Sequence, residues 1–454
     1  MTPPRLLIAL ACLALLGSTA VADVINVPGD YPTIYSAVNS ANDGDVIEVA
    51  AGTYLGSYLS PQGKSITISG ELNADGSHTV ILDGQQSGAV LWCYNDEDTS
   101  TVFRNLVLAN GSSYYGGGLS CYDGSSPAFE NCIFRDNTGT IEGGGIHLRE
   151  NCNPHFINCR FEDNIAYGPG GGMFCMEYSN PTLINCTIST NESIGRGGGI
   201  YCSQSNPTIT GCTISSNTAN SGGGIFCYNS SSPTITGSTI SSNTTFYGGG
   251  GIYSTGGTSN PTVTNCIIES NTTENYGGGF YGDYFTSPAF SGCTISGNTA
   301  TFGGGFYGEG NCNPTLFGCD ISNNSATRGG GIFLTASNSD ITECLIMGNT
   351  AVDYGGGVFS YYSSNPVITD TLLCSNAPDH FFGSWVNNGG NTVEDECPIC
   401  LGDATGDGLV DVNDVLYVLS AWGSDDPYAD FDDNGLINVD DILILLSHFG
   451  ESCP

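Results

Sequence analysis

The stretch NPTITGCTISSNTANSGGGIFC, residues 206–227, decides the fold because the chain repeats its pattern many times. The same pattern reads NPTLINCTISTNESIGRGGGIYC at 180–202 and NPTLFGCDISNNSATRGGGIFL at 313–334. Its proline recurs from Pro127 to Pro366 at intervals of 26 to 28 residues, except at one gap where Ser339 stands 25 residues after Pro314. A fixed period of this length predicts a repeat architecture in which each copy contributes one structural unit.

Each copy alternates apolar and polar residues in short bursts. Ile209, Cys212 and Ile214 are separated by Thr, Ser and Gly, and Ile225 and Cys227 follow the glycine triplet. Such bursts between turn-forming residues indicate short β-strands. About three strands per copy and no helical stretch predict an all-β solenoid, a right-handed parallel β-helix with one coil per copy. A leucine-rich repeat has a similar period, but Leu is scarce at the inward positions of this chain.

In a parallel β-helix, equivalent residues of successive coils stack about 4.8 Å apart. The glycine triplets then permit positive φ and close approach of stacked backbones, where a Cβ would collide with the next coil. We expect most cysteines five residues after the proline to be buried and reduced, because in-register neighbours make strained disulfides. One asparagine per copy predicts a buried amide ladder, formed by Asn137, Asn164, Asn191, Asn217, Asn243, Asn271, Asn298, Asn324, Asn349 and Asn376.

The N-terminal sequence has the features of an export signal. Arg5 precedes an apolar run over residues 6–16 and three small residues at 20–22. We therefore expect residues 1–22 to be a signal peptide. No later stretch is long and apolar enough to span a bilayer, so we expect the protein to be secreted, extracellular or at the cell surface. Residues 31–42 carry apolar side chains at helical spacing, which predicts a helix that caps a β-helix spanning residues 23–396.

The composition is strongly acidic, with 45 Asp and Glu against 8 Lys and Arg and a formal net charge of −37. This excess disfavours nucleic acid and anionic membranes as partners, because both repel an acidic surface. Strong acidity is compatible with an exported protein that holds divalent cations.

Two loops near the C-terminus match the calcium-binding pattern D-x-[DN]-x-[DN]-G. They read DATGDGLVDVND at 403–414 and DFDDNGLINVDD at 430–441, and each precedes an apolar stretch of helical length. We therefore expect residues 397–454 to form a small helical domain that holds two Ca²⁺ ions. The predicted oxygen ligands, with both leucines acting through their carbonyls, are Asp403, Thr405, Asp407, Leu409, Asp411, Asp414, Asp430, Asp432, Asn434, Leu436, Asn438 and Asp441.

Four cysteines flank this duplicated unit. The chain ends of such a unit tend to lie together, so Cys400 and Cys453 can clasp it. Cys397 is then left to pair with Cys374 at the last coil.

One aromatic residue per coil falls at a position that should point away from the core. If Ile200 and Cys202 point inward, Tyr201 between them points outward. The predicted stripe on this outer face consists of Phe174, Tyr201, Phe226, Tyr253, Tyr281, Tyr307, Phe333 and Phe359. Exposed rings in line suit stacking on a polysaccharide or packing on a protein partner. Alternatively, the rings stabilise one another as an aromatic ladder.

The sequence assigns no catalytic residue. Asp136 and Asp163 share a column on adjacent coils, but we favour solvent-facing turn residues over a catalytic pair. Arg135 and Arg160 occupy different columns.

Three segments resemble known families. FRDN (134–137) and FEDN (161–164), together with GGGI, resemble the repeats of chlamydial polymorphic outer-membrane proteins. DYPTIYSAVNSANDGDVIEVAAGTY (30–54) is similar to the first coils and capping helix of pectin-lyase-like β-helix proteins. The duplicated calcium loop resembles a type I dockerin. That resemblance implies docking on a cohesin partner through loop positions ten and eleven, which are Val412-Asn413 and Val439-Asp440 here.

These features predict a secreted or cell-surface, non-catalytic β-helix protein. It would bind a polysaccharide or a protein partner and be anchored through the dockerin-like domain, with a cohesin-like receptor as one candidate. The alternative is a polysaccharide lyase or glycoside hydrolase of a cellulosome-like complex.

Overall fold

The computed structural model of the protein describes residues 22–397, 402–405, 409–424, 426, 428–432 and 434–450. The predicted signal peptide therefore lies outside the described residues except for its last position. Asp407, Cys400 and Cys453 also lie outside them.

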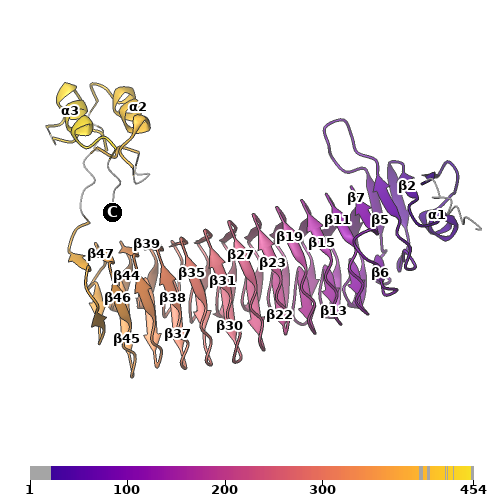
Figure 1. The fold of residues 1–454 in the computed structure, drawn as a ribbon, viewed down its shortest axis with the longest axis horizontal. Coiled ribbons are helices and arrows are strands. Elements are labelled where there is room, and N and C mark those ends of the chain that lie inside the picture. Colours follow the sequence, from indigo (N-terminus) through magenta and orange to yellow (C-terminus); the bar gives the residue numbers. More distant parts are fainter. Residues whose placement is uncertain are drawn as a thin grey trace, which may run out of the picture.

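The predicted all-β solenoid is confirmed. Three long sheets run along it: a 15-stranded sheet A, a 14-stranded sheet B and a 12-stranded sheet C. Sheet A runs from β1 (Val24–Val27) to β49 (Val386–Asn387), sheet B from β3 (Gly52–Leu55) to β50 (Thr392–Glu394), and sheet C from β6 (Leu91–Cys93) to β48 (Phe381–Phe382). Figure 1 shows these strands stacked as successive rungs along the molecule.

One coil illustrates the path of the chain. β23 (Thr208–Thr210) lies in sheet A, β24 (Thr213–Ser215) in sheet B and β26 (Ile225–Tyr228) in sheet C. Between the last two, β25 (Thr218–Ser221) joins a shorter fourth sheet of seven strands, which adds one strand to the three expected per coil. The next coil pairs in parallel without a shift, Ile209 with Ile235 and Ile214 with Ile240.

The asparagine ladder is buried and continuous, as predicted. Asn217 donates from Nδ2 to Asn243 Oδ1 (3.0 Å) of the next coil and to Ile188 O (2.9 Å) of the previous coil. The same Asn243 oxygen also accepts the backbone N–H of Asn217 (2.9 Å). Since every polar atom of the buried amide has a partner, the ladder ties neighbouring coils together at one corner.

The glycine triplets sit at a corner that excludes side chains. Gly222 has φ +62°, and a Cβ there would lie 2.7 Å from Cβ of Phe226. A Cβ on Gly223 would lie 2.6 Å from the carbonyl oxygen of Gly250 in the next coil. The repeated glycines are therefore required by backbone contacts between coils.

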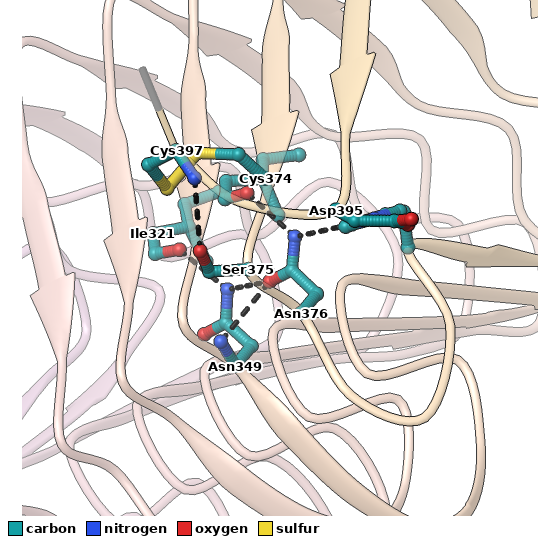
Figure 2. Close-up of a disulfide and its surroundings, with 9 residues drawn as sticks. Ile321, Asn349, Cys374, Ser375, Asn376, Asp395 and Cys397 are labelled. Atoms are coloured by element: carbon teal, nitrogen blue, oxygen red, sulfur yellow. Dashed lines mark hydrogen bonds and ion pairs between the residues drawn. A yellow bond between two sulfur atoms is a disulfide. The ribbon is translucent and has the colours of Figure 1, made fainter. Parts of the chain in front are cut away.

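Both ends of the solenoid are closed. At the N-terminal end, α1 (Ile34–Ser40) is capped by Thr33 and buries Ile34, Ala37 and Val38 against the first coils. At the other end, the predicted disulfide between Cys374 and Cys397 is present. Figure 2 shows it beside the last step of the ladder, where Asn349 donates to Asn376 (2.9 Å).

The described cysteines other than this pair are free and buried, in agreement with the prediction that most thiols are core residues. Two helices, α2 (Val412–Ser420) and α3 (Val439–Ser447), follow the two acidic loops. A separate apolar core holds them together, made of Ala404, Val410, Val418, Ala429, Ile437 and Leu445. The helices of the described residues include none that is long and apolar enough to cross a membrane.

Candidate functional site

The predicted aromatic stripe stacks in register but is not exposed. Tyr201 pairs with Phe174 on one side and Phe226 on the other. Ring centroids lie 5.1 Å apart for Phe174 and Tyr201 and 4.3 Å apart for Tyr253 and Tyr281, with nearly parallel planes. The prediction of an exposed face is wrong, because all eight side chains are between 0 and 8% exposed: Phe174, Tyr201, Phe226, Tyr253, Tyr281, Tyr307, Phe333 and Phe359.

The burial comes from the sharp turn at the glycine triplet. This turn places the residue just before the triplet beside the aromatic residue that comes after the triplet. Tyr276 and Phe302, each directly before a triplet, pack against the column. Arg196, also before a triplet, lies 5.2 Å above the ring of Phe226. The column is thus a second buried core outside sheet C, and burial raises the pKa of Tyr201 to about 12.

The hydroxyl ends of three column tyrosines meet two carboxyl groups. Tyr253 donates to Asp283 Oδ2 (2.9 Å). Tyr281 donates to Glu309 Oε1 (2.6 Å), and Tyr307 donates to Glu309 Oε2 (3.1 Å). The two acids follow paired glycines of adjacent coils, Gly282 and Gly308, so they occupy the same column. The stripe therefore ends in a row of hydroxyl–carboxyl contacts.

Asp283 is a buried carboxyl of this row. Its side chain is only 3% exposed, and its Oδ1 is buried without a hydrogen-bond partner in the protein. Burial raises the pKa of Asp283 from 3.8 to about 6, against the lowering effects of the Thr255 and Tyr253 hydroxyls. A carboxyl with one unsatisfied buried oxygen is costly, which marks the position as a candidate for ligand contact.

Asp283 lines a hollow of about 380 Å³, which we call the tyrosine hollow. Its rim carries exposed rings, including Tyr284, which is 64% exposed. The lining residues are Arg196, Ser221, Phe226, Tyr228, Tyr247, Tyr253, Thr255, Asp283 and Tyr284. Of the predicted stripe, only Phe226 and Tyr253 contribute to it. Aromatic rings, a guanidinium and a carboxyl around one hollow suit a polyhydroxylated ligand.

Sequence reasoning missed most of this hollow. One signal was available, because YGD at 281–283 and YGE at 307–309 place an acid at the same position of adjacent coils. The exposed tyrosines on the rim carry no such repeat. Asp136 and Asp163 lie in exposed turns with φ +56°, as expected for solvent-facing turn residues.

The second acidic loop brings three of its predicted ligands together. Oxygen atoms of Asp430, Asp432 and Asp441 lie within 4.8 Å of one another. Asp441 is fully buried and accepts the N–H groups of Phe431 (2.7 Å) and Asn438 (2.8 Å). The chain has no Lys or Arg beyond Arg328. A buried carboxylate among other carboxylates, with no basic side chain near it in sequence, fits a divalent cation.

The first loop has the same framework. Asp414 is fully buried and accepts both the hydroxyl and the N–H of Thr405 (2.9 Å each). Burial raises the pKa of Asp414, but N–H groups of Asp411 and Thr405 outweigh that effect and leave the pKa below its usual value. Thr405, the residue that departs from the loop pattern, is thus hydrogen-bonded to Asp414, the last predicted ligand of its loop.

The family assignment follows from a match over most of the chain. The model of the right-handed β-helix region matches residues 35–170, 142–268 and 223–397, so the chain belongs to this family. A comparison with curated proteins found no match.

Solved structures resemble this chain at low sequence identity and with TM-scores below 0.5. Tailspike protein 3 of bacteriophage CBA120 is 11% identical with a TM-score of 0.47, and the match covers 80% of this chain and 58% of the tailspike. The A-module of a mannuronan C-5 epimerase from Azotobacter vinelandii is 12% identical with a TM-score of 0.33, covering 79% and 91%. A mannuronic acid specific polysaccharide family 6 lyase from human gut microbiota is 11% identical with a TM-score of 0.39, covering 81% and 92%. The chain thus spans little more than half the tailspike, and these likenesses concern the fold alone.

Proposed function

We propose that this protein binds a polysaccharide in the tyrosine hollow and is anchored by a calcium-loaded C-terminal domain. The observation that carries the first part concerns Asp283, which lines the hollow and whose buried Oδ1 has no hydrogen-bond partner among the described residues. A sugar hydroxyl would supply the missing hydrogen bond. Tyr228 and Tyr284 on the rim offer flat, exposed rings for the apolar faces of neighbouring sugars.

Affinity electrophoresis through gels that contain single polysaccharides tests the glycan site. Asp283→Ala should weaken retention about tenfold, because a hydrogen bond to a charged group contributes about 1.5–3 kcal/mol. Tyr228→Ala should also weaken retention, because it removes a ring that would pack on a sugar face. Asp340→Ala, an exposed acid on sheet A, is the control with the same loss of charge. Unchanged retention of both hollow variants, with circular dichroism like that of the wild type, would refute the site.

A second candidate function is glycoside hydrolysis at the edge of the same hollow, where Asp283 lines the hollow and Glu309 lies one coil further on. Asp283 and Glu309 sit one coil apart in one column, and adjacent coils are separated by about 4.8 Å, close to the carboxyl spacing of retaining glycosidases. The raised pKa of Asp283 suits a general acid, and Glu309 would be the second carboxyl of the pair. Release of reducing sugar by the wild type, lost in Glu309→Gln, would favour hydrolysis. An unsaturated product would instead identify a lyase.

Calcium is the proposed cofactor of the C-terminal domain. When bound, it would neutralise the acidic loops. The residues that would hold it are the predicted ligands of both loops, of which Asp414 and Asp441 are already buried and oriented by backbone N–H groups. Titration calorimetry on the full chain should find two Ca²⁺ ions, and Asp430→Ala should remove one. Binding of two ions by the variant would contradict the assignment of the second loop.

The same domain carries a duplicated apolar surface. Eight exposed side chains, each between 49 and 59% exposed, form pairs that are 27 residues apart: Val412 with Val439, Leu416 with Leu443, Leu419 with Leu446, and Trp422 with Phe449. Exposed apolar patches of this kind mark protein interaction sites. In both halves of the domain this apolar surface begins at loop position ten, which supports docking on a cohesin-like receptor. Leu416→Ser with Leu443→Ser should abolish capture by a panel of immobilised cohesins, whereas Leu416→Met with Leu443→Met should not.

A further inference from the structure

This acidic chain has few basic side chains, of which some are neutralised by a carboxylate and others are not. Arg104 Nε lies 2.7 Å from Glu130, Arg149 Nη2 lies 2.9 Å from Glu177, and Arg328 Nε lies 3.0 Å from Asp353. Each of these arginines is held by a short contact to a carboxylate. They are therefore already neutralised within the fold.

Arg135 and Arg160 differ from them. Their nearest carboxylates among the described residues are Asp136 at 3.8 Å and Glu162 at 3.7 Å, beyond hydrogen-bond distance. Their side chains are 41 and 52% exposed. These two guanidinium groups consequently retain free donors for an external anion.

The two arginines share one hollow of about 620 Å³ on the outer face of sheet B, which we call the arginine hollow. They lie on neighbouring strands, β12 (Ile133–Arg135) and β16 (Arg160–Glu162), where Ile133 pairs with Arg160. Their columns differ, as the sequence indicated, but Arg135 and Arg160 stand diagonally on the same face. Both therefore reach one ligand position.

The arginine hollow has an apolar floor. Ile81, Val107 and Ile133 line it from three neighbouring strands, and Val107 and Ile133 are almost fully buried although they lie on the outer side of the sheet. Such a floor offers contact to the apolar face of a sugar ring next to the two guanidinium groups.

One wall of the hollow comes from an excursion of the chain between β4 (Thr67–Gly70) and β5 (Val80–Asp83). An antiparallel bridge between Leu72 and His78 closes this excursion on itself. His78 Nε2 lies 2.6 Å from the carbonyl oxygen of Asn131 and therefore donates to it. This bond attaches the wall to the sheet beside Ile133, so the hollow is formed before any ligand arrives.

We propose that the arginine hollow binds a single anionic group, a carboxylate or a sulfate, carried by an otherwise neutral sugar chain. Guanidinium groups bind both oxyanions through paired N–H donors. Asp75 and Glu162 also line the hollow, and the chain has a net charge of −37. A densely charged polyanion would meet these carboxylates on either side of the bound group and be repelled, whereas an isolated anionic substituent would not.

Titration calorimetry of the full chain at low salt tests this inference with three small probes: methyl β-D-glucuronide, glucose 6-sulfate and methyl β-D-glucoside. At least one of the two anionic probes should bind, and the neutral glucoside should not. Whichever anionic probe binds more tightly shows whether the hollow prefers a carboxylate or a sulfate. Added salt should weaken binding by screening the charges. Arg135→Gln with Arg160→Gln should lower the affinity at least tenfold. Arg328→Gln, which lies outside the hollow, should leave it unchanged.

Two polymers test the preference for isolated charge. Glucuronoxylan, with single acidic branches on a neutral backbone, should bind, and polygalacturonate should bind more weakly for each acidic group. The reverse order would overturn the preference for isolated charge. Failure of both anionic probes at millimolar concentration, or equal binding by the double variant with unchanged circular dichroism, would overturn the site. Neither result bears on the tyrosine hollow, which lies on sheet C.

Discussion

Replacing Asp283 by Asn should change how the stability of the protein depends on pH. The pKa of Asp283 rises from 3.8 to about 6 because the carboxyl is buried. The folded state therefore favours the protonated form, and this contribution is complete below pH 3.8 and lost as the pH rises through about 6. Since one pKa unit corresponds to about 1.4 kcal/mol, ionisation of Asp283 costs about 3 kcal/mol above pH 6. Asn stays neutral and avoids that cost.

Thermal unfolding at pH 4 and pH 8, at fixed calcium concentration, measures the effect. The midpoint of Asp283→Asn relative to wild type should be higher at pH 8 than at pH 4 by a few degrees, since about 1 kcal/mol shifts a midpoint by about 2–4 °C in domains of 150–250 residues and by less in larger ones. Asp340→Asn, on the exposed face of sheet A, should show no such difference. A pH-independent difference for Asp283→Asn, or one of opposite sign, would refute the assignment of a buried carboxyl with a raised pKa.

Three further predictions concern the solenoid. Phe226→Ala should lower the free energy of unfolding by about 3–5 kcal/mol and lower the thermal midpoint, because the ring is fully buried. Tyr228→Ala on the rim should change the midpoint little, and equal shifts for the two variants would contradict the buried column. Gly223→Ala should also lower the midpoint, since the added Cβ would lie 2.6 Å from a carbonyl oxygen of the next coil, and an unchanged midpoint would argue against that contact. Cys397→Ser should destabilise the last coils by about 3 kcal/mol, by releasing a loop with a sequence separation of 23, and an unchanged midpoint would contradict a stabilising role of this bond.

Features that repeat could be predicted from the sequence. An asparagine, a glycine triplet or a cysteine in every copy contacts its own equivalent in the next coil, so the period alone identifies its neighbours. For this reason the ladder through Asn217 and Asn243 and the glycine corner at Gly223 were predictable. The acidic loops could also be recognised from the sequence, because the predicted ligands of each loop lie within one short segment. The pairing of Cys374 with Cys397 followed from their positions at the end of the last coil.

Features that depend on the angle between sheets, or on a single non-repeating loop, were decided only by the tertiary structure. Alternation along β22 (Ile200–Ser203) correctly places Tyr201 on the outer side of sheet C, but it carries no information about the turn that folds Tyr276 and Phe302 over the column. The aromatic stripe was therefore predicted as a surface and is a core. Likewise, the excursion ending at His78 occurs once, so no period relates it to Arg135. Contacts between equivalent residues of stacked coils recur with the period of the repeat, so one sequence is enough to predict them. Contacts between unlike segments depend on the path of the whole chain.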